Sequence, residues 1–429
     1  MKGIVFTEFL DLVEEKFGLE MVDTIIEQSN LDSGGVYTSI GTYSFSEMLS
    51  LLQNLSANTS ISIDNLLLVY AEHFFSVIEK NYPDMLAMYK DPTIYKSMND
   101  LFPGGHFVFG SSSGDITKES VENDGLVVTA IEFEKTKFEI KTSNVLNSDL
   151  DSFKTGKDLL DSFDKEGLKY MFVVSEGSFI NGSDLTKGMN SSMDDNILIT
   201  GGLCGDDARF ESTVASYNEN PKQGEIVAIG FYGEELEVTF SIYGGWTPFG
   251  PERTVTKSKG NILYELDNMP ALDLYKKYLG EKSKDLPSAA LLYPLNVKSI
   301  NEKQSIVRTI LNINEEDNAM ILAGNIAENA KVQLMMTNVD NIANASERAA
   351  IQAKELRETK AQLAILVSCI GRKLVLDQRV EEEVEEVVEV VDEDTTVCGF
   401  YSYGEIAPFH GETSCQLHNQ TMTITLISE

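Results

Sequence analysis

A short glycine-serine segment holds the first group that could do chemistry. Gly110-Ser111-Ser112-Ser113-Gly114 follows an apolar run and fits the pattern Gly-x-Ser-x-Gly, in which hydrolases present a nucleophilic serine on a turn between a strand and a helix. That chemistry also needs a histidine base and a carboxylate, and His410 and His418 lie downstream. The same residues suit a tight turn in which serine caps the next element. We expect the turn, with Ser112 available to a ligand, and keep a serine hydrolase as the less favoured alternative.

A second glycine-rich turn, Gly201–Gly205, is followed directly by Asp206 and Asp207. Two carboxylates at this place would repel a phosphate and instead suit an ammonium group, a hydroxyl or a cation. The sequence therefore predicts either a ligand contact at Asp206 and Asp207 or a purely structural turn.

Cys369 and Arg372 follow another apolar run, Leu363–Ser368. The planar guanidinium of Arg372 could form two parallel hydrogen bonds with a ligand carboxylate. Together with the aspartates, it would supply the charge pair that an amino-acid zwitterion requires. The alternative is an internal salt bridge from Arg372 to Glu381 or Glu382.

Polar residues also gather near the C-terminus. Tyr403 and Glu405 precede His418 and Asn419, which enter a final apolar run, and such a polar entrance is unusual for mere packing. A haem would require one neutral imidazole and an apolar slot, and His418 is the best candidate for its axial ligand. A hydrogen-bonded structural histidine is the competing interpretation.

Composition narrows the classes of function. The 429 residues carry a net charge of −34, with 42% hydrophobic residues. Such an acidic surface repels phosphates, so we expect neither a nucleic-acid partner nor insertion into a membrane. The four cysteines form no Cys-x-x-Cys pair, and the first 20 residues do not resemble a signal peptide. A reducing, cytoplasmic location is the consistent expectation.

The pattern of apolar residues predicts an all-helical beginning and a mixed α/β body. Helices are expected from about Phe6 to Phe17, Leu19–Gln28, Ser44–Asn54 with Ser44 and Glu47 as a capping box, and Ser62–Lys80. From about residue 104, short apolar runs end in glycine-rich turns, and a similar series recurs after residue 319. We interpret the two series as an ancient duplication. Further helices are expected over Ala271–Leu279 and Glu381–Asp394, the latter strongly acidic.

The body resembles FIST proteins, through segments that follow one another in that family's order. These are GSSSGDI, VSEGSFINGSDLTKG, ITGGLCGDDARFEST, GGWTPFGP, LYELDNMPALDLYKKYLGE, SCIGRKLVLDQRVEEEVE, GFYSYGEIAPF and LHNQTMTITL. The resemblance implies a signal-transduction input domain that binds a small ligand, an amino acid or similar, beside a partner such as a histidine kinase or a cyclase. Some FIST proteins bind haem and respond to nitric oxide.

The first 85 residues resemble an H-NOX domain, through MKGIVFTEFLDLVEEKFGLEMVDTIIE, SGGVYTSIGTYSFSEMLSLLQNLS and YAEHFF. That family binds haem through a later histidine, whose position falls near Phe102 in this chain. The family's Tyr-x-Ser-x-Arg motif is also absent, because Tyr95 and Ser97 are followed by Asn99. We therefore expect that the H-NOX haem site is not built, and that His73 is packed rather than a replacement ligand.

The sequence predicts an organisation in three parts. They are a partial H-NOX-like helical domain over residues 1–100, a FIST N-terminal lobe over 104–245 and a FIST C-terminal lobe over 246–429. The expected function is ligand sensing through a partner protein, without catalysis. A haem-based nitric oxide sensor is the first alternative, and haem is its possible cofactor.

Overall fold

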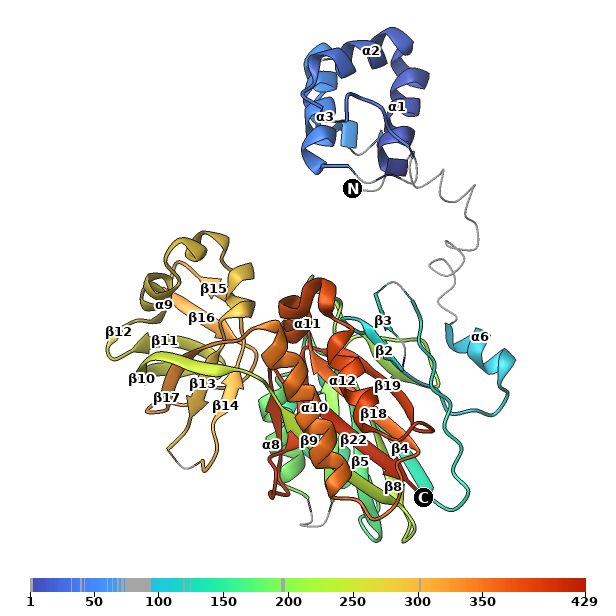
Figure 1. Cartoon of the computed structure of the whole chain (residues 1–429), viewed down its shortest axis with the longest axis vertical. Helices are drawn as coiled ribbons and strands as arrows, with labels where there is room; N and C mark the ends of the chain where they lie inside the picture. The colour runs from blue at the N-terminus through green and yellow to red at the C-terminus, as the bar shows by residue number, and fades with distance from the viewer. Residues whose placement is uncertain are drawn as a thin grey trace. The chain divides into compact units, whose positions relative to one another are not determined.

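A computed structural model describes residues 3–31, 33–38, 41, 43–59, 61–63, 65–67, 69–70, 73, 94–118, 120–123, 125–193, 197–300 and 302–429. The chain divides into two compact units, Met1–Pro103 and Gly104–Glu429. Each unit is described by itself (Figure 1).

The first unit is helical, as the sequence predicts. Its described helices are α1 (Gly3–Phe17), α2 (Leu19–Gln28), α3 (Phe45–Thr59) and α6 (Ile94–Leu101). Apolar side chains at helical spacing, such as Phe6, Phe9 and Leu51, form its core. Ser44 caps α3 as expected, because its hydroxyl accepts the Ser46 N–H at 3.2 Å, but Glu47 is not its capping-box partner: the buried carboxylate accepts hydrogen bonds from Ser33 (2.5 Å) and Tyr37 (2.8 Å). Most of the helix expected over Ser62–Lys80 lies outside the described residues.

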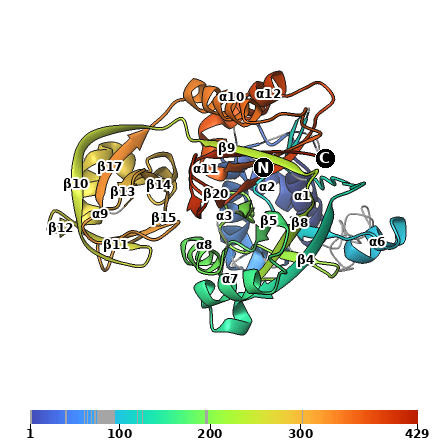
Figure 2. The ribbon, with the colours of Figure 1, turned by 90° about the horizontal axis from the view of Figure 1, so that it is seen from below.

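The second unit is built on two mixed sheets that pack face to face (Figure 2). We call them the β5 sheet and the β18 sheet after their central strands. The β5 sheet has the order β21-β20-β6-β5-β8-β4. Its strands are β4 (Lys137–Asn144), β5 (Leu168–Ser175), β6 (Leu198–Leu203), β8 (Glu225–Tyr232), β20 (Gly404–Pro408) and β21 (Cys415–His418).

The β18 sheet repeats this topology, with the order β3-β2-β19-β18-β22-β9. Its strands are β2 (Asp115–Thr117), β3 (Val121–Glu122), β9 (Glu237–Tyr243), β18 (Leu363–Cys369), β19 (Thr396–Ser402) and β22 (Met422–Ser428). In each sheet the central strand has one parallel and one antiparallel neighbour. This correspondence supports the duplication. Each sheet also takes its outer hairpin, β20–β21 or β2–β3, from the other repeat, so residues 104–245 and 246–429 exchange strands. A short ladder pairs β1 (Val108–Gly110) with β7 (Ala215–Tyr217).

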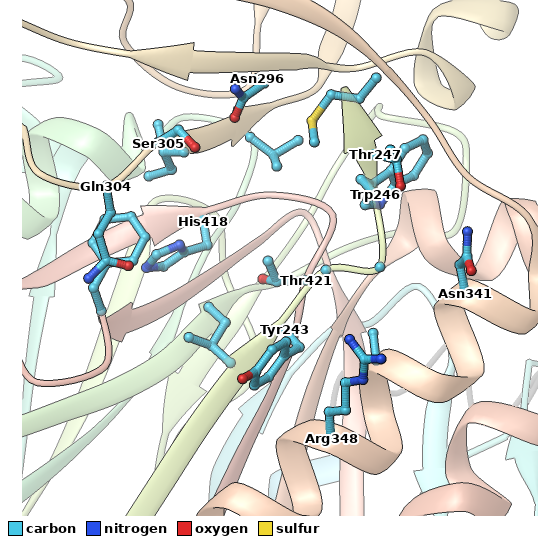
Figure 3. A pocket seen from close by; sticks show the side chains of 18 of the residues that line it. Tyr243, Trp246, Thr247, Asn296, Gln304, Ser305, Asn341, Arg348, His418 and Thr421 are labelled. Carbon is cyan, nitrogen blue, oxygen red and sulfur yellow. The ribbon is translucent and has the colours of Figure 1, made fainter. Parts of the chain in front are cut away.

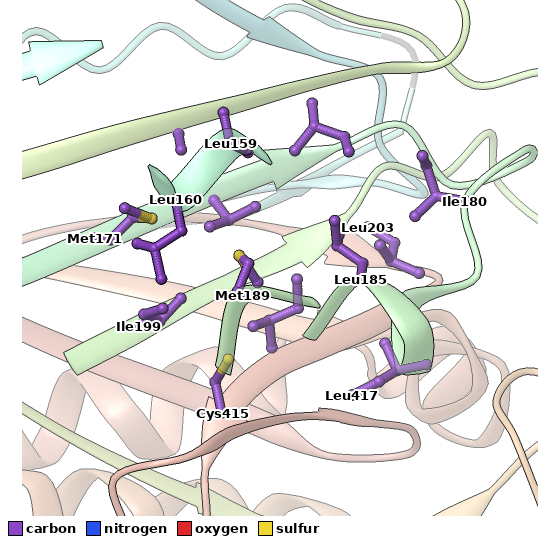
Figure 4. Packing of buried hydrophobic residues seen from close by; sticks show 14 of the residues in the cluster. Leu159, Leu160, Met171, Ile180, Leu185, Met189, Ile199, Leu203, Cys415 and Leu417 are labelled. Atoms are coloured by element: carbon purple, nitrogen blue, oxygen red, sulfur yellow. The ribbon is translucent and has the colours of Figure 1, made fainter. Parts of the chain in front are cut away.

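Helices cover the outer faces of the two sheets. On the β5 sheet lie α7 (Ser152–Asp161) and α8 (Gly182–Asn190), where Leu159, Leu185 and Met189 pack against the strands (Figure 4). On the β18 sheet lie α10 (Val339–Glu355) and α12 (Glu382–Val390). The acidic helix is shorter than predicted and packs by its valines, Val384 and Val387. Between β18 and α12 runs α11 (Ile370–Leu376).

A separate antiparallel subdomain is inserted between β9 and α10 (Figure 2). It comprises β10 (Thr247–Lys259), β11 (Ile262–Leu266), β12 (Met269–Pro270), α9 (Ala271–Leu279), β13 (Leu295–Lys298), β14 (Ile306–Arg308), β15 (Ile310–Asn314), β16 (Ala319–Leu322) and β17 (Lys331–Met336). The predicted helix Ala271–Leu279 is confirmed to the residue, and Leu272 and Tyr275 bury its apolar face. The predicted fold class, an α/β body with mixed sheets behind an all-helical segment, is therefore confirmed.

Candidate functional site

The serine turn serves to order the backbone. The Ser112 hydroxyl donates a hydrogen bond to Asp115 at 2.7 Å and accepts the Gly114 N–H at 3.1 Å. The turn leads into strand β2, whereas a hydrolase elbow leads into a helix. The expected turn is thus observed, and the strand–turn–helix context of the hydrolase alternative is not.

The Asp206 carboxylate is buried and organises its own loop. It accepts backbone N–H groups of residues 210–212 at 2.8–2.9 Å, and the Tyr403 hydroxyl also donates to it. Asp207 is exposed and forms an ion pair with Lys373 at 3.2 Å. These contacts occupy Asp206 and Tyr403, so they favour the structural turn over a contact with a ligand ammonium group.

Arg372 is completely buried. Its guanidinium donates to the Glu383 carboxylate at 2.6 and 2.9 Å, to the Ser346 hydroxyl at 2.6 Å and to the carbonyls of Gly244 (2.7 Å) and Ile342 (3.1 Å). All five N–H groups have acceptors. An internal salt bridge was the stated alternative for this arginine, and the observed contacts match it rather than a ligand contact.

Two details of that prediction need correction. The partner of Arg372 is Glu383, one residue beyond the expected Glu381 or Glu382. The Cys369 thiol is buried, and burial raises its pKa well above the usual value. Cys369 therefore packs as an apolar residue, and Asp207 takes Lys373, not Arg372, as its cation.

The polar segment His418–Thr421 forms the turn between β21 and β22. Gln420 adopts a left-handed backbone conformation, with φ of 64°, which is strained for a residue with a side chain. The neighbouring Gly371 approaches so closely that a Cβ atom would lie 2.2 Å from the Gln420 amide nitrogen. The side-chain oxygens of Asn419 and Gln420 are buried without a hydrogen-bond partner in the described chain. Strain and unsatisfied buried polar atoms together mark a functional region.

Glu405 lies completely buried beneath this turn. Its carboxyl group accepts hydrogen bonds from the hydroxyls of Ser402 (2.6 Å) and Thr421 (2.7 Å) and from the Thr421 N–H (3.1 Å). Burial raises the pKa of Glu405 to about 7, against these hydrogen bonds. Glu405 thus holds Thr421, the last residue of the turn, through two hydrogen bonds.

The turn borders a cavity of about 470 Å³ between the sheets and the β10–β17 subdomain. We call it the ligand cavity. It is lined by Ile242, Tyr243, Gly244, Gly245, Trp246, Thr247, Asn296, Gln304, Ser305, Ile306, Val307, Met335, Asn341, Asn344, Ala345, Arg348, Phe409, His418 and Thr421. Figure 3 shows Arg348 and Asn341 extending from α10 on one side, with Gln304 and His418 on the other.

Several polar groups in the ligand cavity have no hydrogen-bond or ion-pair partner among the described residues. The side chains of Asn296, Gln304, Asn344 and Arg348 form no hydrogen bond or ion pair with another described residue. The indole N–H of Trp246 is buried and also lacks a partner there. A cavity with several unpaired hydrogen-bonding groups can orient a small polar molecule.

Sequence reasoning identified only the His418 side of this cavity. The Asn341, Asn344 and Arg348 positions share one face of α10, at spacings of three and four residues. Trp246, the only tryptophan of the chain, lies within the GGWTPFGP segment that carried the family resemblance. These two signals could have pointed to the cavity, but nothing in the sequence places them together.

The surroundings of His418 do not suit a haem. The His418 Nε2 atom lies 3.0 Å from the Ala407 carbonyl, so this nitrogen carries the proton and donates. Burial lowers the His418 pKa to about 3, which keeps the imidazole neutral. The surrounding amides, hydroxyls and guanidinium are not the apolar slot that haem requires. His73 lies 3.8 Å from Glu8, and His106 contacts Tyr217 at 2.7 Å.

Three family models match the chain. The FIST N domain matches residues 85–269, the FIST C domain residues 271–408, and the haem-NO-binding family residues 2–117. None of the described helices has the length and low charge content that a bilayer span requires.

A curated relative and two solved structures are also similar. An uncharacterised protein of Methanocaldococcus jannaschii is 26% identical over 243 residues, 49% of this chain and 45% of that protein, so the chain spans less than half of this relative. The crystal structure of the Fe(II) unliganded H-NOX protein from K. algicida is 35% identical and covers 55% of this chain and 97% of its own, with a TM-score of 0.21. The solution structure of the H-NOX from Shewanella woodyi is 17% identical and covers 55% and 95%, with a TM-score of 0.20. TM-scores this low carry no argument about the fold.

Proposed function

Because the chain belongs to the FIST-domain proteins, with a haem-NO-binding segment ahead of the FIST body, we propose that it is a sensory signal-transduction protein. It binds a small polar molecule, an amino acid or similar, in the ligand cavity. It acts by binding rather than by catalysis, and it passes the signal to a partner protein such as a histidine kinase or a cyclase.

The observation that carries this proposal is the state of the polar groups in the cavity. Buried polar atoms in folded proteins nearly always have partners, yet the Trp246 N–H does not. The neighbouring side chains of Asn296, which is half-buried, and of Gln304 and Asn344, which are exposed, form no hydrogen bond with another described residue and can turn to a ligand. A bound ligand would supply the missing partners.

The position of the cavity supports a role in signalling. Its walls come from the sheets, from α10 and from the β10–β17 subdomain. A ligand that contacts all three would therefore stabilise the conformation in which these parts lie together over conformations in which they do not. We further propose a cytoplasmic location, which the four unpaired cysteines support.

Thermal unfolding of the full chain in the presence of amino acids and other small polar compounds tests the proposal. A ligand should raise the midpoint, and the stabilisation should grow with the logarithm of one plus the ratio of ligand concentration to Kd. Ser305→Phe, which narrows the cavity, should abolish the shift, whereas Ser97→Phe on the exposed face of α6 should not. Binding that survives Ser305→Phe would place the ligand elsewhere.

Haem-based sensing of nitric oxide is the alternative. The neutral imidazole of His418 is its favourable feature, because the hydrogen bond from Nε2 to Ala407 leaves Nδ1 with its lone pair, but the polar walls oppose it. We therefore expect no sharp Soret band after stoichiometric addition of haem. A Soret band that shifts with nitric oxide and disappears in His418→Ala would establish the alternative.

A further inference from the structure

The charges around the ligand cavity are unlike those of the chain as a whole. The chain has 68 acidic and 34 basic residues. None of the described residues that line the cavity is acidic, and Arg348 is the only one that carries a charge, since His418 is neutral. A negatively charged ligand would be repelled by most of this surface but would meet a cation here.

Arg348 is free to bind such a ligand. Its guanidinium forms no ion pair, hydrogen bond or ring contact with any described residue. By contrast, Arg253, Arg308, Arg357, Arg372 and Arg379 are each engaged with other groups of the chain.

Two further donors lie at the same cavity. The unpaired indole N–H of Trp246 can only donate. Asn341 lies in the first turn of α10, whose N-cap is Asn338, so the positive end of this 17-residue helix also borders the cavity. Each of these groups favours an anion over a neutral or cationic ligand.

The charge of Arg348 and the other residues that line the cavity indicate the ligand's charge, shape and polarity. One formal positive charge suits a monoanion better than a phosphate, which carries nearly two negative charges at neutral pH. A planar guanidinium also matches a carboxylate. Ile306, Met335 and Phe409 offer an apolar wall, and the Gln304 amide can bond a polar group at the far end.

We propose that the ligand is a small carboxylic acid with an apolar body, and that Arg348 holds its carboxylate. This inference rests on the proposed function and narrows its ligand to one chemical class.

Paired acids and neutral amides test the inference. The probes are lactate and lactamide, propionate and propionamide, and butyrate and butyramide, with inorganic phosphate as a further anion. Binding is measured by calorimetric titration of the full chain. At least one acid should bind at least about tenfold more tightly than its amide, the size expected for a charge-assisted hydrogen-bonded pair.

Variants of Arg348 identify the group responsible. Arg348→Ala should weaken binding of that acid at least about tenfold and remove its advantage over the amide, and Arg348→Lys should restore part of it. Arg209→Ala is the matched control, because Arg209 is also exposed and unpartnered among the described residues but lies outside the cavity.

The outcomes separate this inference from the proposed function. Amides that bind as well as acids, phosphate that binds more tightly than every acid, or acid binding unchanged by Arg348→Ala would overturn the inference and leave the cavity as a ligand site. If no acid, amide or other small polar compound binds in the cavity, both proposals are wrong.

Discussion

Arg348 lies on α10 and Arg372 donates to it, but their guanidinium groups are in opposite states. Arg372 is fully buried and donates to Glu383, Ser346 and the Ile342 carbonyl. Arg348, on α10 itself, is exposed at the ligand cavity and contacts none of the described polar groups. The residue type is the same, but the Arg372 guanidinium forms its hydrogen bonds within the fold, whereas the Arg348 guanidinium can still bind a ligand.

The difference shows how function can be recognised in this molecule. The sequence draws attention to charged residues at strand ends, yet Arg372, Asp206 and Glu405 all have their hydrogen bonds satisfied within the chain. The cavity groups, by contrast, have few partners. Unmet hydrogen-bonding capacity, rather than charge alone, distinguishes the proposed ligand cavity from the polar framework.

The largest effect is expected from breaking the buried ion pair. Arg372→Met leaves the Glu383 carboxylate buried without a counter-charge and should reduce the free energy of unfolding by about 3–5 kcal/mol. Arg379→Met, which breaks solvent-accessible ion pairs with Asp340 and Glu382, should cost less than about 1 kcal/mol. Urea unfolding measures both. Equal losses in the two variants would show that Arg372 is not part of the framework.

The next effect is a pH dependence that originates at Glu405. Its pKa is about 7 in the folded chain, against an ordinary value of 4.5, so the folded state holds the proton more strongly than the unfolded state. Stability from this group is therefore present at low pH and is lost as pH rises toward and beyond 7. The loss amounts to about 3.5 kcal/mol at most, at about 1.4 kcal/mol per pKa unit.

Glu405→Gln isolates this contribution, because glutamine does not titrate. Urea unfolding at pH 5, 6, 7 and 8 should show the wild-type chain losing stability relative to the variant as pH rises. The pKa of His418 is lowered to about 3, so this residue has the opposite effect. Its contribution to the stability of the folded chain is lost as pH falls below about 6.5. Parallel pH profiles of wild type and Glu405→Gln would contradict the assignment.

A smaller loss is expected at the Asp206 turn. Asp206→Ala removes the acceptor of three backbone N–H groups and should cost about 2 kcal/mol. Asp207→Ala removes only an exposed ion pair with Lys373 and should cost less than about 0.5 kcal/mol. If the two losses in thermal or urea unfolding were the same, the turn would not depend on Asp206.

The smallest effect on stability is expected in the cavity itself. Arg348→Ala and Asn344→Ala remove exposed groups that have no described partner, and each should change the free energy of unfolding by less than about 0.5 kcal/mol. A loss above about 2 kcal/mol in either variant would reveal a structural contact and would remove the contrast between Arg348 and Arg372.

Much of the fold follows from local patterns in the sequence. Hydrophobic spacing correctly places the helices Leu19–Gln28 and Ala271–Leu279, and the apolar runs become the central strands β5 and β18. The repeated series of strands likewise indicates two related sheets. These features depend on neighbours in the chain, which the sequence displays directly.

The exchange of hairpins and the ligand cavity do not follow from such patterns. The pairing of β20 with β6 joins residues about 200 positions apart, and no local signal specifies it. The cavity likewise combines Trp246, Gln304, Arg348 and His418 from separate elements. Only His418 stood out, because a polar run before an apolar strand is unusual.

The most direct test of the ligand cavity uses the fact that Trp246 is the only tryptophan. The ¹⁵N-labelled chain should therefore give one indole N–H signal in a proton–nitrogen correlation spectrum. If the cavity is the ligand site, a compound that stabilises the chain should shift this signal with the same Kd as the stabilisation. A compound that stabilises the chain while the indole signal stays unchanged would show that the sensor binds its ligand elsewhere.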